Sequence, residues 1–235
     1  MRITSLEKRY GKLRALSGVD LEVAGGEAFG LVGANGAGKT TLIRCMLDLS
    51  APDSGTVSIF GVPARRPQAR ARLAYVPERF VPPHYLQGGE FLSSLSHLAG
   101  VPYDAERART LLAELELDAA VLERPVRQLS KGMTQKLGLA AVLLLERDLY
   151  VLDEPMSGLD PAARVAVKSA LRRLGDGGRT LFFTSHVLAD VEELCSSIAV
   201  LEQGSVRFRG APAALCRRYG TSSLEQAFMR CIRER

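Results

Sequence analysis

The sequence predicts an α/β fold in which a largely parallel sheet carries a glycine-rich loop. In the second half of the chain, short apolar runs alternate with segments of helical periodicity, as in strands joined by helices. Near the N-terminus, another apolar run leads into the glycine-rich octet 33–40, and a helix-like segment follows it. Between about residues 90 and 146 the apolar spacing is helical, so this stretch is predicted to be a helical insert.

The first part of the chain reads as short strands separated by turns. Apolar runs are broken by Gly25-Gly26 and by the Pro-Asp-Ser-Gly turn at 52–55. The expected strands cover residues 2–7, 17–23, 28–32, 57–60 and 73–76. One helix is expected among them, over 41–49, directly after the octet.

The rest of the chain supplies the helical insert and the other strands. The expected helices cover residues 91–98, 105–117, 134–145, 161–174, 188–194 and 224–232, and the expected strands 149–152, 181–184 and 198–201. We therefore predict one domain over 1–235. Its parts are a core with a β subdomain (1–79 and 148–212), a helical subdomain (80–147) and a short helical tail (213–235).

The octet has the residue types that a nucleoside triphosphate needs. It consists of Gly33, Ala34, Asn35, Gly36, Ala37, Gly38, Lys39 and Thr40, and Thr41 follows. Glycines let backbone N–H groups cradle phosphate oxygens at a helix N-terminus, Lys39 reaches the outer phosphates and the Thr40 hydroxyl binds magnesium. The alternative is a glycine turn that binds nothing, and the strand-loop-helix context argues against it. The loop alone does not separate a kinase from a GTPase or a transport ATPase.

Two carboxylates follow a second apolar strand, 149–152, at the edge where a parallel sheet opens its ligand crevice. Asp153 is expected to help hold magnesium. If the strand continues, Glu154 points the opposite way and serves as the catalytic base beside the terminal phosphate. The alternative is an acidic strand end that faces solvent.

A second anion-seeking segment precedes the helix expected at 134–145. Ser130 and Gly132 lie in a polar stretch at this helix N-terminus, where the helix dipole favours negative charge. The chain is therefore expected to carry two helix N-termini that can bind an anion.

With these two anion-binding helix N-termini, nearly the whole chain resembles the ATP-binding subunits of ABC transporters. The resemblance implies a P-loop NTPase (RecA-like) core with an antiparallel β subdomain and a helical subdomain that bears the signature loop. It also implies that the signature loop of one subunit closes over the nucleotide of the other. The matching positions are Tyr10 for adenine stacking, Ser130, Lys131, Gly132 and Met133 for the signature, Ser157, Gly158, Leu159 and Asp160 for the D-loop, and His186 for phosphate sensing.

Two of these positions allow a simpler interpretation. Two departures from the usual family sequence indicate a subgroup of the family. Tyr10 could be an ordinary aromatic residue, and His186 could cap the following helix. Glu78 stands where the family commonly has glutamine; it can still bind magnesium but adds negative charge. The signature reads Ser-Lys-Gly-Met rather than Ser-Gly-Gly-Gln. Both departures look like those of ATPases that serve ABC-2-type exporters, so export is the expected direction.

Composition limits the partners. The net charge is +5 and the arginines are spread along the chain, so nucleic acid is not the expected ligand. The apolar stretch 137–145 is too short to span a membrane, and the four cysteines lack metal or redox spacing and are expected to be free thiols. The resemblance implies ATP and Mg²⁺ as ligands, a homodimer or a pair with a second ABC ATPase, a separate integral membrane permease, and a place on the cytoplasmic face of the cell membrane. The alternatives are a soluble relative acting on ribosomes or nucleic acid, a small P-loop kinase, and a regulatory subunit with little hydrolysis.

Overall fold

Two sheets organise the chain in a computed structural model that describes residues 1–234. An antiparallel sheet has the order β2-β1-β4-β5 and consists of β1 (Arg2–Tyr10), β2 (Leu13–Glu22), β4 (Ser54–Ile59) and β5 (Val62–Pro63). The main sheet has the order β10-β9-β3-β8-β7-β6 and consists of β3 (Ala28–Val32), β6 (Leu73–Val76), β7 (Leu149–Leu152), β8 (Thr180–Ser185), β9 (Ser197–Glu202) and β10 (Ser205–Gly210). All neighbours in the main sheet are parallel except the edge pair β9 and β10, so the predicted α/β fold is confirmed.

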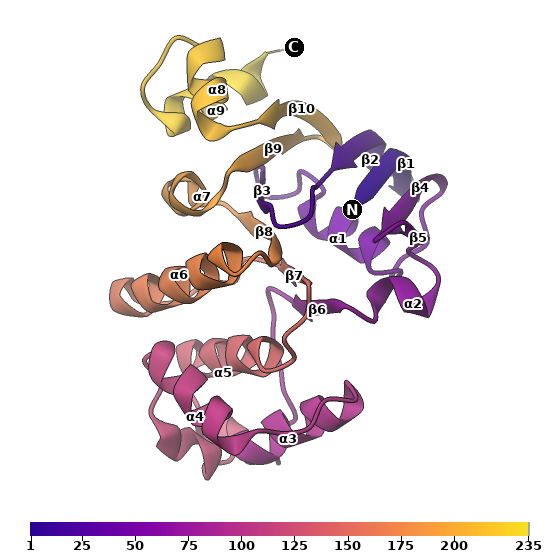
Figure 1. The fold of residues 1–235 in the computed structure, drawn as a ribbon. Coiled ribbons are helices and arrows are strands. Elements are labelled where there is room, and N and C mark those ends of the chain that lie inside the picture. Colours follow the sequence, from indigo (N-terminus) through magenta and orange to yellow (C-terminus); the bar gives the residue numbers. More distant parts are fainter. Residues whose placement is uncertain (235) are drawn as a thin grey trace.

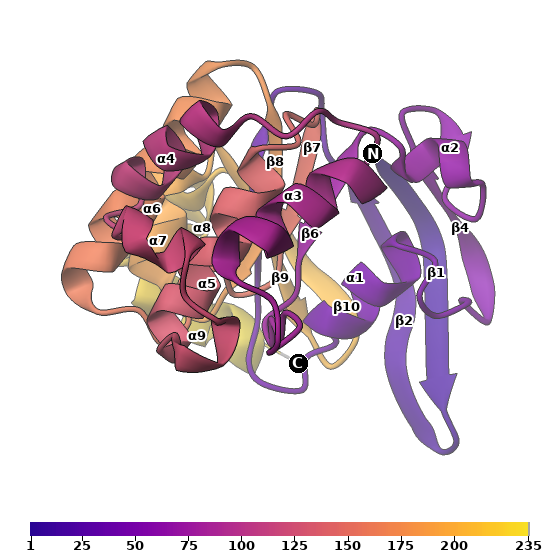
Figure 2. The same ribbon diagram turned by 90° about the horizontal axis from the view of Figure 1, so that it is seen from below.

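The two helices α1 and α2 lie beside the antiparallel sheet, and the other helices gather in three places (Figures 1 and 2). α3, α4 and α5 lie together at the β6 edge of the main sheet, α6 and α7 cover one of its faces, and α8 and α9 lie near β10. Their bounds are α1 (Lys39–Met46), α2 (Pro67–Arg70), α3 (Gly88–Leu98), α4 (Ala105–Glu114), α5 (Lys131–Leu143), α6 (Pro161–Asp176), α7 (Leu188–Leu194), α8 (Pro212–Arg218) and α9 (Leu224–Arg233), with 3-10 turns at Ala119–Leu122 and Val126–Gln128. Among residues 1–234, no helix has the length and apolar character needed to cross a bilayer.

The central parallel strands of the main sheet are buried on both faces, which explains their continuous apolar sequences. In β7, Leu149 and Val151 pack into an apolar core shared with the antiparallel sheet and α1, whereas Tyr150 and Leu152 pack into a second core shared with the helices. This alternation follows the pleat of the strand. The carboxyl ends of the parallel strands are therefore held rigidly from both sides.

Two strands, β5 and β10, and two helices, α2 and α8, were not predicted, and several helix boundaries were wrong. β10 is an edge strand of mixed polarity that depends on pairing with β9, while α2 and α8 are single short helices that begin at a proline. α2 also brings order to the arginine-rich stretch 65–72. α5 begins at Lys131 rather than at residue 134, so the residues that precede the expected helix form its first turn. The four cysteines are free, as predicted.

Candidate functional site

Most of the predicted site residues line one pocket, with a volume of about 830 Å³, at the carboxyl ends of β3, β7 and β8. The wall consists of Tyr10, Leu13, Arg14, Ala15, Ala34, Asn35, Gly36, Ala37, Gly38, Lys39, Thr40, Thr41, Glu78, Asp153, Glu154, His186 and Gln203. Segments that are far apart in the sequence thus meet at the sheet edge where the crevice was expected.

The glycine-rich loop is shaped by steric demands that only glycine meets. A Cβ atom on Gly33 would lie 2.4 Å from the carbonyl oxygen of Leu201, and one on Gly38 would lie 2.6 Å from that of Ala15. Gly38 also has a φ angle of +108°. α1 begins at Lys39, two residues earlier than predicted, so its N-terminus opens directly onto the loop. The loop therefore has the geometry of an anion-binding helix start.

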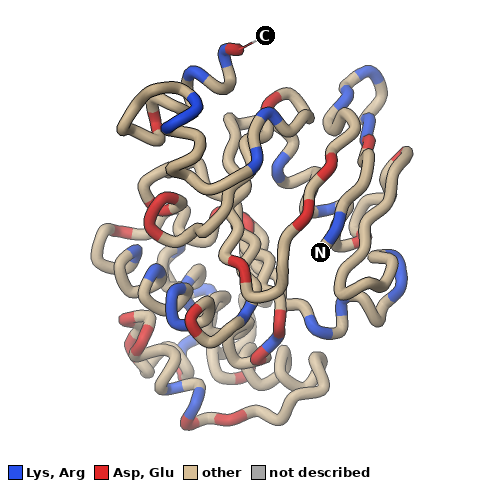
Figure 3. The backbone as a smooth tube through the Cα atoms, turned by 45° about the horizontal axis from the view of Figure 1, so that its top comes forward, with Lys and Arg blue, Asp and Glu red and all other residues tan. Residues whose placement is uncertain are grey.

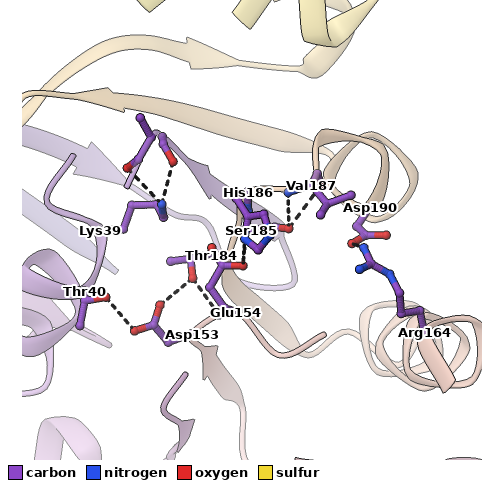
Figure 4. Close-up of polar contacts among 12 residues, drawn as sticks. Lys39, Thr40, Asp153, Glu154, Arg164, Thr184, Ser185, His186, Val187 and Asp190 are labelled. Atoms are coloured by element: carbon purple, nitrogen blue, oxygen red, sulfur yellow. Dashed lines mark hydrogen bonds and ion pairs between the residues drawn. The ribbon is translucent and has the colours of Figure 1, made fainter. Parts of the chain in front are cut away.

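Lys39 is buried and held against this loop. Its Nζ donates hydrogen bonds to the carbonyl oxygens of Gly33 (2.7 Å) and Ala34 (3.4 Å), as Figure 4 shows. An ammonium group in this position can exchange carbonyl partners for phosphate oxygens without a large movement.

Asp153 is almost fully buried, and two threonines hold it. Thr40 Oγ1 donates to Asp153 Oδ2 (3.1 Å), and Thr184 Oγ1 donates to Asp153 Oδ1 (2.6 Å). Burial raises the pKa of the Asp153 carboxyl, and the negative charge of Glu78 adds to this rise, while the threonine hydrogen bonds and Lys39 oppose it. Hydroxyl and carboxylate oxygens clustered beside the phosphate loop fit a hard cation such as Mg²⁺.

Glu154 does not continue the strand, so the expectation that strand alternation aims its side chain is wrong. β7 ends at Leu152, and Glu154 has a left-handed φ of +48°. This conformation costs a non-glycine residue on the order of 1–3 kcal/mol and persists where the surroundings fix it. Here the Glu154 N–H donates to Thr184 Oγ1 (2.9 Å). The backbone turn sends Asp153 and Glu154 to different partners (Figure 4).

His186 is the side-chain partner of Glu154. Its Nδ1 lies 2.8 Å from Glu154 Oε2, and its backbone N–H donates to the same oxygen at 3.4 Å. The capping reading of His186 fails because the N-cap of α7 is Val187. Glu154 is 8% exposed, so the reading of a carboxylate that faces solvent fails as well.

Tyr10 lies on the rim of the pocket with 46% of its surface exposed. Its hydroxyl is 3.3 Å from Ser50 Oγ, and the Lys8 ammonium lies 5.4 Å from the ring centre. The tyrosine is thus anchored at its polar end, which leaves ring surface beside the loop for an aromatic ligand.

The residues of the predicted signature do not line this pocket. Ser130 caps α5, its Oγ accepting from the Met133 N–H at 3.2 Å, and Lys131, Gly132 and Met133 form the first helical turn. Ser130 and Lys131 are exposed. The structure therefore leaves this second helix start outside the pocket of its own chain.

The predicted D-loop residues lie between the pocket and the signature. Asp160 caps α6, its Oδ1 accepting from the Ala163 N–H at 2.9 Å. One turn later, Arg164 forms an ion pair with Asp190 of α7, which is buried. The helix after the D-loop is thus tied to the helix after His186 (Figure 4).

Sequence reasoning missed two buried polar residues that hold the segment carrying the carboxylates. Thr184 of β8 is fully buried and bonds to both Asp153 and Glu154. Gln135 of α5 is also buried, and its Nε2 donates to the Pro155 carbonyl at 3.2 Å. A hydroxyl at the end of an otherwise apolar strand was the available signal for Thr184, whereas the partner of Gln135 depends on how two distant segments pack.

The sequence of this chain is similar to those of known ABC transporter ATP-binding proteins. A family model described as ABC transporter matches residues 16–157. An uncharacterized ABC transporter ATP-binding protein of Synechocystis is 38% identical over 86% of this chain and 58% of the relative. A Nod factor export ATP-binding protein I of Burkholderia orbicola is 41% identical over 90% of this chain and 70% of the relative. The chain spans about 60% of the length of the first two curated relatives, 58% and 61% respectively.

Solved structures share the fold. One titled as the ATP-binding subunit of an ABC transporter matches with a TM-score of 0.86 and 32% identity over 98% of each chain. A dimeric cassette in a post-hydrolysis state with ADP and Pi matches with a TM-score of 0.81 over 89% of this chain and 97% of the other. At 22% identity, this second match speaks for the fold alone.

Proposed function

This chain belongs to the ABC transporter family of ATP-binding subunits, and we propose that it is an ATP-hydrolysing motor that drives export through a separate membrane permease. One observation carries the proposal. The phosphate loop, the two carboxylates and His186 line one pocket, whereas Ser130 and Gly132 lie outside it. A site with this division is incomplete until a second subunit brings its own signature residues.

The residues of the pocket divide the chemistry among them. Lys39 and the N–H groups of the loop bind the phosphates, and Tyr10 offers its ring to the base. Thr40, Asp153 and Glu78 are the residues that would hold Mg²⁺, which neutralises phosphate charge and polarises the terminal phosphate when bound. Glu154 takes a proton from the attacking water, and the hydrogen bond to His186 keeps its carboxylate in place.

Dimer closure couples this chemistry to movement. ATP favours the closed pair because only there do both the phosphate loop and the partner's signature contact the triphosphate, and hydrolysis removes that preference. We propose a homodimer or a pair with a second ABC ATPase, located on the cytoplasmic face of the membrane. Glu78 and the helical region 80–128 would pass the movement to the permease.

Export is the proposed direction because two independent lines support it. Glu78 and the Ser-Lys-Gly-Met signature look like those of exporter ATPases. Several similar proteins are named as Nod factor export ATP-binding proteins, including those of Burkholderia orbicola and Paraburkholderia xenovorans. The proposal takes from them the direction of transport and leaves the cargo open.

The main alternative is a soluble relative that acts on ribosomes or nucleic acid. Such a protein needs a basic surface. Figure 3 shows Lys and Arg interspersed with Asp and Glu along the chain, and several arginines are paired, such as Arg173 with Glu114 and Arg179 with Asp148. This distribution favours the transporter proposal.

The test is to purify a tagged Glu154→Gln protein from native membranes in mild detergent with ATP and Mg²⁺, and to identify its partners by mass spectrometry. A polytopic membrane protein in about equal amount is the expected result. Ribosomal proteins or nucleic acid without a membrane partner would overturn the proposal. The same preparation from the Lys39→Ala protein is the control for contacts that do not depend on ATP.

A further inference from the structure

The side chain of Gln135 connects α5, the helix that begins with the signature, to the segment that carries the catalytic base. Gln135 lies in the second turn of α5 and is 5% exposed. Its Nε2 donates to the Pro155 carbonyl at 3.2 Å. Pro155 directly follows Glu154, so this hydrogen bond holds the chain one residue beyond the base.

Two further contacts join the same surfaces. A Cβ atom on Gly158 would lie 3.2 Å from the Lys131 side chain, and one on Gly132 would lie 3.6 Å from Leu159 Cδ2. The first turn of α5 therefore packs on the D-loop, while Gln135 reaches past it to Pro155. Among these contacts, the Gln135 hydrogen bond is the polar one and is the nearest to Glu154.

Glu154 is held from three directions, and Gln135 provides one of them. Thr184 accepts the Glu154 N–H, His186 contacts its carboxylate, and Gln135 fixes the following residue. Since the left-handed backbone of Glu154 persists only where its surroundings fix it, loss of one support changes the aim of the carboxylate. The first two supports lie in the core, whereas Gln135 lies on the helix whose N-terminus faces outward.

We propose that Gln135 is a positioning residue that couples the signature helix to Glu154 of the same chain. The inference rests on the proposed function, in which Ser130 and Gly132 contact the nucleotide held by the partner. When that contact shifts α5, the hydrogen bond to Pro155 passes the shift to Glu154. Each subunit thereby aligns its own base in response to the nucleotide bound by the other.

The test compares ATP hydrolysis by the full chain and three variants. Gln135→Leu removes the donor with little change of volume, and Gln135→Glu is isosteric but places a carboxylate against the Pro155 carbonyl. Gln226→Leu is the matched control, because Gln226 is an exposed glutamine on α9 that also makes one side-chain hydrogen bond, with Thr221. Circular dichroism and thermal unfolding confirm that each protein folds.

The inference predicts a loss in kcat without a loss in nucleotide binding. For both Gln135 variants we expect kcat to fall about tenfold while KM for ATP stays within about twofold, because the base is misaligned but the phosphate loop is untouched. A Glu154→Gln, Gln135→Leu double variant should still dimerise with ATP as readily as Glu154→Gln alone. The Gln226→Leu protein should match the wild type.

A side chain that only stabilises the fold would behave differently. Unchanged kcat in both folded Gln135 variants overturns the inference, and so does a loss of kcat accompanied by an equal loss of ATP-dependent dimerisation. A wild-type protein that hydrolyses no ATP would overturn the proposed function and the inference with it. Normal wild-type turnover with normal Gln135 variants would overturn the inference alone.

Discussion

The phosphate-loop pocket and the signature turn each contain a helix N-terminus, yet the two sites are built differently. In the pocket, Lys39, Asp153 and Glu154 are buried, and each is held by hydrogen bonds within the chain. In the signature turn, Ser130 and Lys131 are exposed and line no part of that pocket. The difference supports the proposal that one region is preorganised to hold nucleotide and that the other meets a second subunit. Substitutions in the two regions should therefore have separable effects.

The largest effect should come from Glu154→Gln. Losing a positioned general base should lower kcat by roughly 10²–10⁴-fold, while ATP affinity stays within about twofold. The protein should accumulate as an ATP-bound dimer, visible by size-exclusion chromatography with light scattering. Glu146→Gln is a matched control, since Glu146 is an exposed glutamate with a similar φ of +47°. Normal turnover by Glu154→Gln would remove Glu154 from the base role.

Lys39→Ala should come next and should act on binding. Charge-assisted hydrogen bonds are worth about 1.5–3 kcal/mol each, so ATP affinity should fall roughly 10- to 100-fold in titration calorimetry. Lys136→Ala, which removes a lysine bonded to the Glu116 carbonyl on the surface of the helical region, should leave affinity unchanged. Equal affinities for the Lys39→Ala and wild-type proteins would contradict the role of the pocket.

Gly132→Asp should act in the opposite way, on dimerisation rather than on ATP binding by the monomer. The position has space, because a Cβ atom there would make only ordinary contact with Leu159, so Gly132→Ala serves as a folded control. A carboxylate at this helix start would repel the partner's triphosphate. We expect ATP-dependent dimerisation to weaken at least about tenfold, while ATP binding by the monomer changes less than about twofold. A loss of monomer binding would show that the two regions are not separate.

Asp153→Asn should have the smallest effect on the protein without ligands, and this effect should be stabilising. Burial raises the pKa of Asp153, so the folded state binds more protons than the unfolded state, and stability falls as pH rises from the ordinary carboxyl pKa through the raised one. The neutral amide avoids this loss, so above that window the variant should have a higher Tm, on the order of 2–4 °C. The gain should disappear below the window. A lower Tm of the variant at neutral pH would contradict this assignment. In the presence of ligands, the same variant should lose Mg²⁺-dependent hydrolysis.

The sequence predicted those parts of the site that a continuous stretch of residues defines. The octet 33–40 and the strand before Asp153 carry their own chemistry, so the loop and the sheet edge could be read directly. The direction of Glu154 could not, because it depends on a left-handed backbone that Thr184 and Gln135 support from other segments. The short edge strand β10 was missed for a related reason, since only its pairing with β9 defines it.

The most direct test of the shared site is to mix two impaired proteins, Lys39→Ala and Gly132→Asp, at ATP and protein concentrations at which neither hydrolyses ATP alone. If each site combines the phosphate loop of one subunit with the signature of the other, a mixed dimer has one dead site and one intact site. Random pairing makes half of the dimers mixed with half of their sites intact, so ATPase activity should recover to at most about a quarter of the wild-type rate, and to less where the base of the intact site depends on the signature contact of its own chain. No recovery, with mixed dimers confirmed by differential tags, would contradict the account.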